Sequence, residues 1–154
     1  MRRKHRDNDT MYQRILLCYD GTAEGRNALR DGADVAICMK TETHLLAVIR
    51  SVTGRSVPEG LTEAAFHREN EEAMQILNEG VAWLKERGLD AHGYIAFGDP
   101  IEQIDLTARS LNVDLIVLGH RKRSRLARWW SDSEDATLLE RAPCSILVAV
   151  GPPQ

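Results

Sequence analysis

Residues 113–119 read VDLIVLG, and residues 120–133 continue as HRKRSRLARWWSDS. The first segment is almost continuously apolar, which is typical of a strand that is covered on both faces within a parallel sheet. It stops at Gly119, where the backbone can turn sharply or let a ligand approach closely. Ligands of open α/β sheets bind beyond the carboxyl ends of the strands, where the strand order reverses. The basic segment that follows is therefore the first place to look for a binding site.

Strand-like and helix-like segments alternate through the rest of the chain. Besides the segment at 113–118, short apolar stretches with strand character lie at residues 14–19, 44–50, 93–97 and 145–150. Helices are expected over about residues 22–39, 62–87 and 133–141, with a further helix beginning at Pro100 and a loop over residues 51–60. Strands that alternate with helices predict a parallel sheet with right-handed crossovers and helices on both faces.

Local signals mark where these helices begin and end. Thr22 and Asp99 are suited to cap the N-termini of two helices, and a proline at the first helical position follows Asp99. Gly88 follows basic residues, as is usual just past a helix C-terminus. Gly25 and Gly32 weaken the helical pattern of the first helix, because glycine is a poor helix former.

Length, charge and cysteine content limit the class of protein. The 154 residues fit one domain, which we assign to residues 13–154, and the polar residues 1–12 are expected to form a disordered leader. A net charge of -3 provides no general attraction to nucleic acid or to an anionic membrane. No apolar run reaches the roughly 18 residues that a membrane-spanning helix needs. Three widely spaced cysteines suit a reducing cytoplasm and match neither a disulfide framework nor a zinc motif.

Common catalytic and phosphate-binding motifs are absent from the sequence, including the P-loop, the dinucleotide fingerprint, the zinc-binding histidine pair and the nucleophile elbow. Asp20 ends the first strand, where a carboxylate either binds a ribose hydroxyl or base amine or simply holds a turn. His120 follows the buried strand, but no serine, cysteine or carboxylate can be paired with it from the sequence. We therefore assign no catalytic residue and no metal ligand.

The basic loop after Gly119 allows two interpretations. It carries Arg121, Lys122 and the pair Trp129-Trp130. Its cations are suited to neutralising phosphates. The loop equally fits a solvated face whose tryptophans dock on a partner chain. The residues alone leave both interpretations open.

Four stretches together resemble the universal stress protein family. They are ILLCYDGTAEGRNAL at 15–29, GDPIEQI at 98–104, VDLIVLGH at 113–120 and ERAPCSILVAV at 140–150. The resemblance covers nearly all of residues 13–150. It implies a five-stranded parallel sheet in the order 3-2-1-4-5 with helices on both faces, a Rossmann-like fold similar to that of the adenine nucleotide alpha hydrolases. It also implies a cytoplasmic homodimer that pairs through the last strand.

The nucleotide motif of that family is altered in this chain. The motif is a glycine, two residues, a glycine, nine residues, a glycine, and then serine or threonine. It begins here at Gly119 and ends at Ser133, but Lys122 and Asp132 stand in place of the second and third glycines. The phosphate half of the site is therefore changed.

The nucleoside half is retained. Asp20, next to Gly21, matches the aspartate that contacts ribose or adenine in the family, and Val48 matches a position whose backbone holds the adenine. If a nucleotide binds, the resemblance assigns its contacts to Asp20, Gly21, Val48, Gly119, Arg121, Lys122 and Ser133.

Asp132 is the more damaging of the two changes. Glycines in this motif let backbone N–H groups wrap a phosphate, and Lys122 at least brings a positive charge. Asp132 lies at the entrance of a helix, where its carboxylate satisfies the N–H donors that a phosphate would use. Two negative groups ~4 Å apart also repel by about 1 kcal/mol in water. We therefore predict weak or absent ATP binding.

Two functions of different classes remain. The first is a dimeric, non-enzymatic stress-response protein that needs no cofactor and acts through protein partners at the basic tryptophan-containing loop. The alternative is an ATP- or AMP-binding stress regulator, with magnesium and with slow ATPase activity at most. In either case the apolar last strand would leave a bare sheet edge, which predicts a homodimer that covers it.

Overall fold

The structure, a computed structural model, describes residues 10–49, 62–120 and 132–150. The elements in chain order are β1 (Arg14–Cys18), α1 (Ala23–Met39), β2 (Glu42–Ile49), α2 (Thr62–Glu86), β3 (His92–Phe97), α3 (Pro100–Ser110), β4 (Leu115–His120), α4 (Asp132–Arg141) and β5 (Ser145–Val150). This is the predicted alternation. The expected loop over 51–60 and the basic loop lie outside the described residues, as does most of the expected leader.

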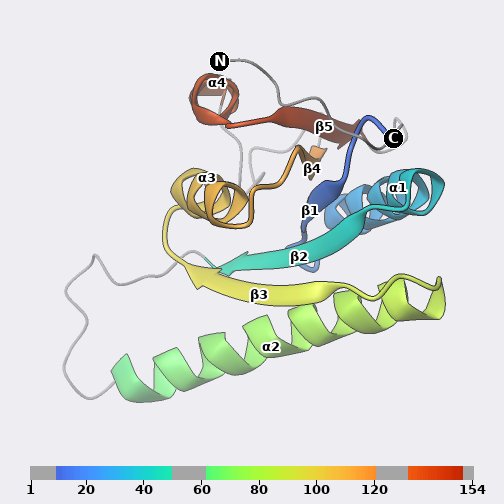
Figure 1. Cartoon of the computed structure of the whole chain (residues 1–154). Coiled ribbons are helices and arrows are strands. Elements are labelled where there is room, and N and C mark those ends of the chain that lie inside the picture. The colour runs from blue at the N-terminus through green and yellow to red at the C-terminus, as the bar shows by residue number, and fades with distance from the viewer. Residues whose placement is uncertain (1–9, 50–61, 121–131, 151–154) are drawn as a thin grey trace.

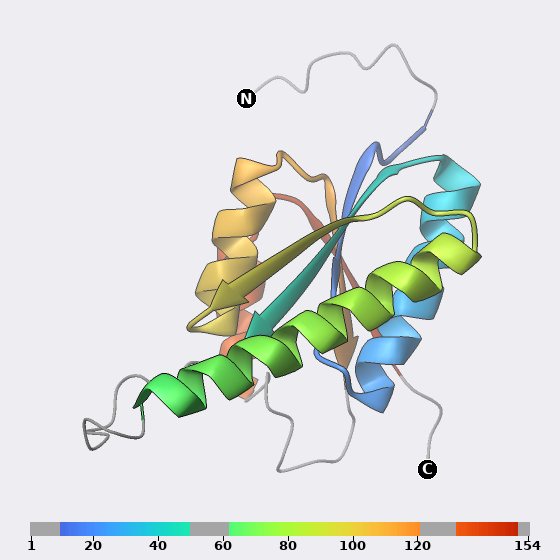
Figure 2. The same cartoon turned by 90° about the horizontal axis from the view of Figure 1, so that it is seen from below.

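The five strands form one sheet in the order β3-β2-β1-β4-β5. All four neighbouring pairs are parallel, and Ile15 of β1 lies level with Thr43 of β2 and with Leu115 of β4. The chain leaves β1 for β2 on one side and later reaches β4 on the other, so the strand order reverses at β1. Figure 2 shows the strands running toward the lower edge of the view, away from the N-terminus. The predicted fold class and sheet order are confirmed.

Helices cover both faces of this sheet, with α1 and α2 on one face and α3 and α4 on the other (Figure 1). Successive side chains of a strand point to opposite faces. Leu17 and Tyr19 therefore enter the core beneath α1 and α2, whereas Leu16 and Cys18 enter the core beneath α3 and α4. Burial on both faces explains why the interior strands are nearly continuous apolar runs.

The predicted helix ends are confirmed at the caps. The Thr22 hydroxyl accepts a hydrogen bond from the Gly25 N–H at 3.1 Å, and the Asp99 carboxylate accepts one from the Glu102 N–H at 3.0 Å. Gly88 follows α2 with φ +82°, a left-handed conformation that glycine adopts without steric cost. Each helix start thus satisfies a backbone donor that has no partner within the helix.

Several strand boundaries differ from the predicted ones because pairing with neighbours decides them. The strand predicted to stop at Gly119 continues to His120, which lies level with Val150 of β5. β2 begins at Glu42, two residues early, because β1 already lies alongside it there. β1 ends at Cys18, one residue early, where the chain turns toward α1.

No helix among the described residues is both long and apolar enough to cross a membrane.

Candidate functional site

The candidate site lies at the carboxyl edge of the sheet, where β1 is shorter than both of its neighbours. β1 ends at Cys18, level with Leu46, and β2 continues from there to Ile49. β4 continues to His120, past Val117, the last of its residues that lies level with a residue of β1. The ends of β2 and β4 therefore project beyond β1 at the point where the strand order reverses, which is where open α/β sheets bind ligands.

Asp20 follows β1 at this edge and is half-buried. Its Oδ1 accepts hydrogen bonds from the Thr22 backbone N–H, at 3.0 Å, and from the Thr22 hydroxyl. A Cβ atom at Gly25 would stand only 2.7 Å from the same oxygen, so a glycine is needed for this close approach. Asp20 therefore braces the residue that caps α1. The turn role is present, and the binding of a ribose or a base stays a prediction.

The sequence predicts Thr22 as a helix cap, and the structure adds its contact with Asp20. The signal was available, because an aspartate side chain that bonds the backbone two residues later is a common turn. Thr22 links the cap of α1 to the Asp20 turn, because its hydroxyl accepts a hydrogen bond from the Gly25 N–H and donates one to Asp20. The orientation of the Asp20 carboxylate is thus tied to the N-terminus of α1.

Val48 can offer a ligand only its backbone groups, because the residue is only 3% exposed. The Tyr19 N–H donates to the Leu46 carbonyl at 3.0 Å, which places the Leu46 carbonyl on the β1 side of β2. Alternate residues of a strand direct their backbone groups to the same side. Val48, two residues further on, therefore directs its N–H and C=O toward the space beyond the end of β1. It offers one donor and one acceptor at the predicted position of an adenine.

The two candidate glycines, Gly21 and Gly119, differ in what the structure shows about them. Gly21 adopts φ +80°, which favours glycine, and a Cβ atom there would stand 3.1 Å from Ile76 of α2. Gly119 lies within β4, level with Ala149 of β5. Gly21 follows β1 directly after Asp20, and Gly119 is the second-to-last residue of β4, so both lie at the carboxyl edge of the sheet. Contact with a ligand stays a prediction for each.

The phosphate side of the predicted site is only partly described. Arg121 and Lys122 lie outside the described residues. Asp132 and Ser133 are the first and second residues of α4, so the final part of the motif coincides with the entrance of a helix. The prediction that Asp132 lies at the entrance of a helix is confirmed, and the approach of a phosphate to it stays a prediction. The role of its carboxylate stays a prediction.

A separate polar cluster lies at the opposite, amino ends of β2 and β3. His44 is 3% exposed, with Nδ1 3.2 Å from the Tyr94 hydroxyl and Nε2 3.1 Å from Glu42 Oε1. The His92 ring lies alongside at a centroid distance of 5.4 Å. Burial lowers the pKa of His44 and outweighs the attraction of Glu42. Within the described residues, no three or more His, Cys, Asp or Glu side chains are arranged to hold a metal ion.

Acidification is expected to destabilise the fold through His44. Below a pH of about 6.5, the ordinary pKa of histidine, unfolded chains take up a proton that the folded His44 resists, so the free energy of unfolding falls as the pH falls. Above that pH, His44 is neutral in both states and contributes no slope. We expect His44→Phe to flatten this part of the curve in urea unfolding between about pH 5 and pH 7.5. His67→Gln, at an exposed position of α2, should keep the wild-type slope, and an unchanged slope in His44→Phe would contradict the assignment.

Comparisons with known proteins place this geometry in a family. The sequence profile of the universal stress protein family matches residues 11–149. The universal stress protein YxiE of Bacillus subtilis is 27% identical over 146 residues, which span 90% of this chain and 99% of that protein. Universal stress protein MJ0531 of Methanocaldococcus jannaschii is 24% identical over 148 residues, which span 96% of this chain and 87% of that protein.

Solved structures share the fold. Universal stress protein UspA from Lactobacillus plantarum superposes with a TM-score of 0.75 at 20% identity, over 90% of this chain and 97% of that one. An Arabidopsis thaliana family protein solved with AMP bound has a TM-score of 0.61 at 14% identity, over 91% and 92% of the two chains. A universal stress protein solved in complex with cAMP has a TM-score of 0.65 at 18% identity, over 89% and 96%. Because the family profile spans nearly the whole of the described structure, the chain belongs to the universal stress protein family.

Proposed function

We propose that this protein is a cytoplasmic stress regulator that binds an adenosine monophosphate at the carboxyl edge of the sheet and binds ATP weakly. The observation that carries the proposal is the shortness of β1, which leaves the Val48 backbone facing the edge at which the strand order reverses. Family relatives with AMP and cAMP bound support a ligand of this class. Both of those ligands carry a single phosphate.

The nucleoside half of the proposed site needs few groups. The Val48 N–H and C=O would pair with the adenine edge, one as donor and one as acceptor. A carboxylate has two oxygens and about four lone-pair positions. Thr22 uses Oδ1 of Asp20, so the carboxylate keeps capacity to accept from the ribose hydroxyls. The bond to Thr22 would hold the carboxylate in one orientation before the ligand arrives.

The phosphate half of the proposed site limits how many phosphates a bound nucleotide can carry. Asp132 begins α4, and a carboxylate at a helix entrance occupies the donors and the favourable end of the dipole that a phosphate chain would use. A single phosphate can stay nearer the ribose, whereas the chain of ATP must extend past Asp132. Lys122 and Arg121 would then supply cations for the single phosphate.

Removing the charge of Asp132 is expected to strengthen ATP binding. We expect about fivefold tighter binding of ATP with magnesium to Asp132→Asn, because the removed repulsion is about 1 kcal/mol, while AMP binding changes less. Asparagine is accepted at a helix start about as well as aspartate, so the fold should be unaffected. Isothermal titration calorimetry of AMP and ATP on both proteins measures this.

Asp99→Asn is the control, since Asp99 is also an aspartate at the start of a helix, where it caps α3, and stands outside the proposed phosphate path. It should leave both affinities unchanged. Wild-type protein that binds ATP as tightly as AMP would overturn the monophosphate preference. Wild-type protein that binds neither nucleotide would overturn the binding proposal itself.

We also propose that two copies pair through β5. This strand lies at one end of the sheet order, and Val148 and Val150 on it are each 45% exposed. An apolar edge strand invites another strand to pair with it, and two copies related by a twofold axis close the edge. The dimer does not depend on nucleotide.

A second candidate function is a non-enzymatic protein that acts through protein partners and holds no nucleotide. The replacement of two motif glycines by Lys122 and Asp132 favours it. Native mass spectrometry of freshly purified protein separates the two candidates. A dimer with one nucleotide mass per chain supports the nucleotide regulator, and a bare dimer that stays bare with added AMP supports the partner-binding protein.

A further inference from the structure

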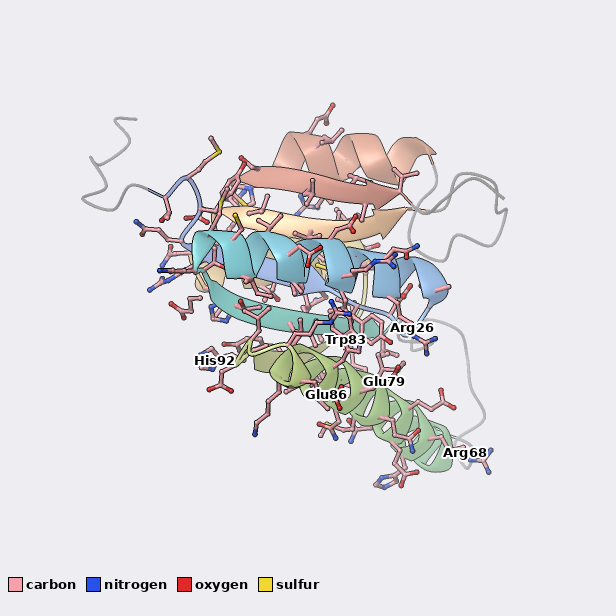
Figure 3. All side chains as sticks on the ribbon, turned by 90° about the vertical axis from the view of Figure 1, so that its right-hand side faces the viewer. Arg26, Arg68, Glu79, Trp83, Glu86 and His92 are labelled. Atoms are coloured by element: carbon pink, nitrogen blue, oxygen red, sulfur yellow. The ribbon has the colours of Figure 1, made fainter. Side chains whose placement is uncertain are left out.

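A groove of about 260 Å³ lies between α1 and α2, on the face of the sheet opposite to α3 and α4. Tyr19 forms its floor, and Arg26 and Arg30 of α1 form one wall. Glu79 and Trp83 of α2, with Arg87 directly after its last residue, form the other wall. Figure 3 shows Arg26, Glu79 and Trp83 lying toward one another between the two helices, with Arg68 near the other end of α2. This groove is distinct from the Val48 edge and from the nucleotide proposal.

The floor is held by close packing. The Tyr19 residue is 1% exposed, and a Cβ atom at either Gly25 or Gly80 would stand 3.0 Å from its ring. The two glycines thus let both helices approach the ring closely. The Tyr19 hydroxyl donates to Glu79 Oε1 at 3.2 Å, and Arg26 Nη2 donates to the same oxygen at 3.2 Å. Burial raises the pKa of Tyr19, so the hydroxyl stays a donor at neutral pH.

The walls carry an excess of positive charge. Three guanidinium groups and one carboxylate line the groove, a surplus of two positive charges. Within the described ranges Arg26 pairs with Glu79, whereas neither Arg30 nor Arg87 is paired with a carboxylate there. The residues of each wall are spaced by four, which brings them to one helix face. The spacing is visible in the sequence, but only the packing of α1 beside α2 brings the two walls together.

An aromatic face lies beside these cations. The guanidinium carbon of Arg87 stands 3.8 Å from the centroid of the Trp83 ring, in the range of a cation–π contact. A guanidinium group in contact with an aromatic ring can still donate its N–H groups to an acceptor. A planar ring can stack beside this pair, and a carboxylate or phosphate can accept from the guanidinium forks.

We infer that the groove between α1 and α2 binds a small organic anion that carries a planar ring, such as an aromatic carboxylate or an aromatic phosphate. The ring would stack against Trp83, and the anionic group would accept hydrogen bonds from Arg30 and Arg87. The groove is smaller than the ~300 Å³ at which drug-sized pockets begin, so it suits ligands of one or two rings. The excess of guanidinium groups disfavours a cationic ligand.

The test uses 1-naphthoate as the probe and the indole N–H of Trp83 as the reporter. The chain has three tryptophans, so Trp83→Phe identifies the Trp83 signal in a proton–nitrogen correlation spectrum of the full chain. Titration with 1-naphthoate is expected to shift that signal to saturation. The neutral amide of the same ring system should bind at least about tenfold more weakly, as expected for loss of a charge-assisted hydrogen bond.

Matched variants separate the groove from general electrostatics. Arg30→Gln with Arg87→Gln should weaken 1-naphthoate binding at least about tenfold. Arg68→Gln removes an exposed arginine from α2 away from the groove and should leave it unchanged, as should Asp20→Asn. An unshifted Trp83 signal at millimolar 1-naphthoate overturns the inference. Equal binding of the neutral amide, or an equal loss in Arg68→Gln, overturns it as well.

Discussion

Leu17→Ala is expected to lower the free energy of unfolding by about 2–5 kcal/mol, the range measured for buried leucines, and a second substitution, Gly32→Ala, should restore part of that loss. Leu17 lies in β1, the middle strand, and is 1% exposed beneath α1. A Cβ atom at Gly32 of α1 would stand 2.3 Å from Leu17 Cδ2 and 3.4 Å from Val117 Cγ1. The new methyl group would thus fill space that the truncated side chain vacates.

Gly32→Ala alone is expected to be destabilising. Alanine favours the helix by about 1 kcal/mol relative to glycine, but an added methyl group in a filled core costs about 1–3 kcal/mol. Since the nearest atom belongs to a buried leucine between α1 and the sheet, the steric cost outweighs the gain in helix propensity. The double variant removes that cost, so the two effects should fall short of additivity by about 1 kcal/mol or more.

Urea unfolding followed by circular dichroism measures the four proteins of this cycle. Leu106→Ala provides the matched control, because Leu106 is 52% exposed on α3 and surface exchanges usually change stability by less than about 0.5 kcal/mol. Additive effects of Leu17→Ala and Gly32→Ala would contradict the proposed contact between β1 and α1.

The paired substitutions Val148→Asp and Val150→Asp are expected to convert the proposed dimer into a monomer. The two valines point to the same face of β5, because they are two residues apart on one strand. Each is 45% exposed, whereas Ala149 between them is buried. In a twofold pair of β5 edges, the new carboxylates would lose apolar contact area and would face like charges across the interface.

Size-exclusion chromatography with light scattering at tens of micromolar measures the mass of wild type and variant. Met74→Asp on α2 is the control, since Met74 is also an exposed apolar residue but lies on another face. We expect it to keep the mass of the dimer. Wild-type protein that elutes as a monomer would contradict the dimer, and a variant that stays dimeric would move the interface away from β5.

Residues close together in the chain determined the caps and the order of the elements. Thr22 and Asp99 cap α1 and α3 through a side chain and an N–H three residues later, and such contacts are visible in the sequence because no distant residue takes part. Alternating apolar strands and helices predicted a parallel α/β sheet by the same local reasoning. The order of the strands came from the resemblance to the family.

Only the tertiary structure decided where strands end and what glycines do. β4 continues through Gly119 because β5 lies alongside, and β1 stops early enough to leave the Val48 backbone at the open edge. Gly32, which weakened the predicted helix, lies within an unbroken α1. A glycine is needed at this position because a side chain there would collide with Leu17. Neither result could be read from neighbours in the chain, since each depends on contact with a distant segment.

The groove beside Tyr19 shows most clearly what the sequence alone does not reveal. Arg26 and Trp83 lie far apart in the sequence, and neither marks a shared site by itself. They line one groove only because α1 and α2 lie on the same face of the sheet and close over the Tyr19 ring. The sequence therefore determined the elements and the residue types of the candidate sites, and packing between distant segments decided which of those residues share a site.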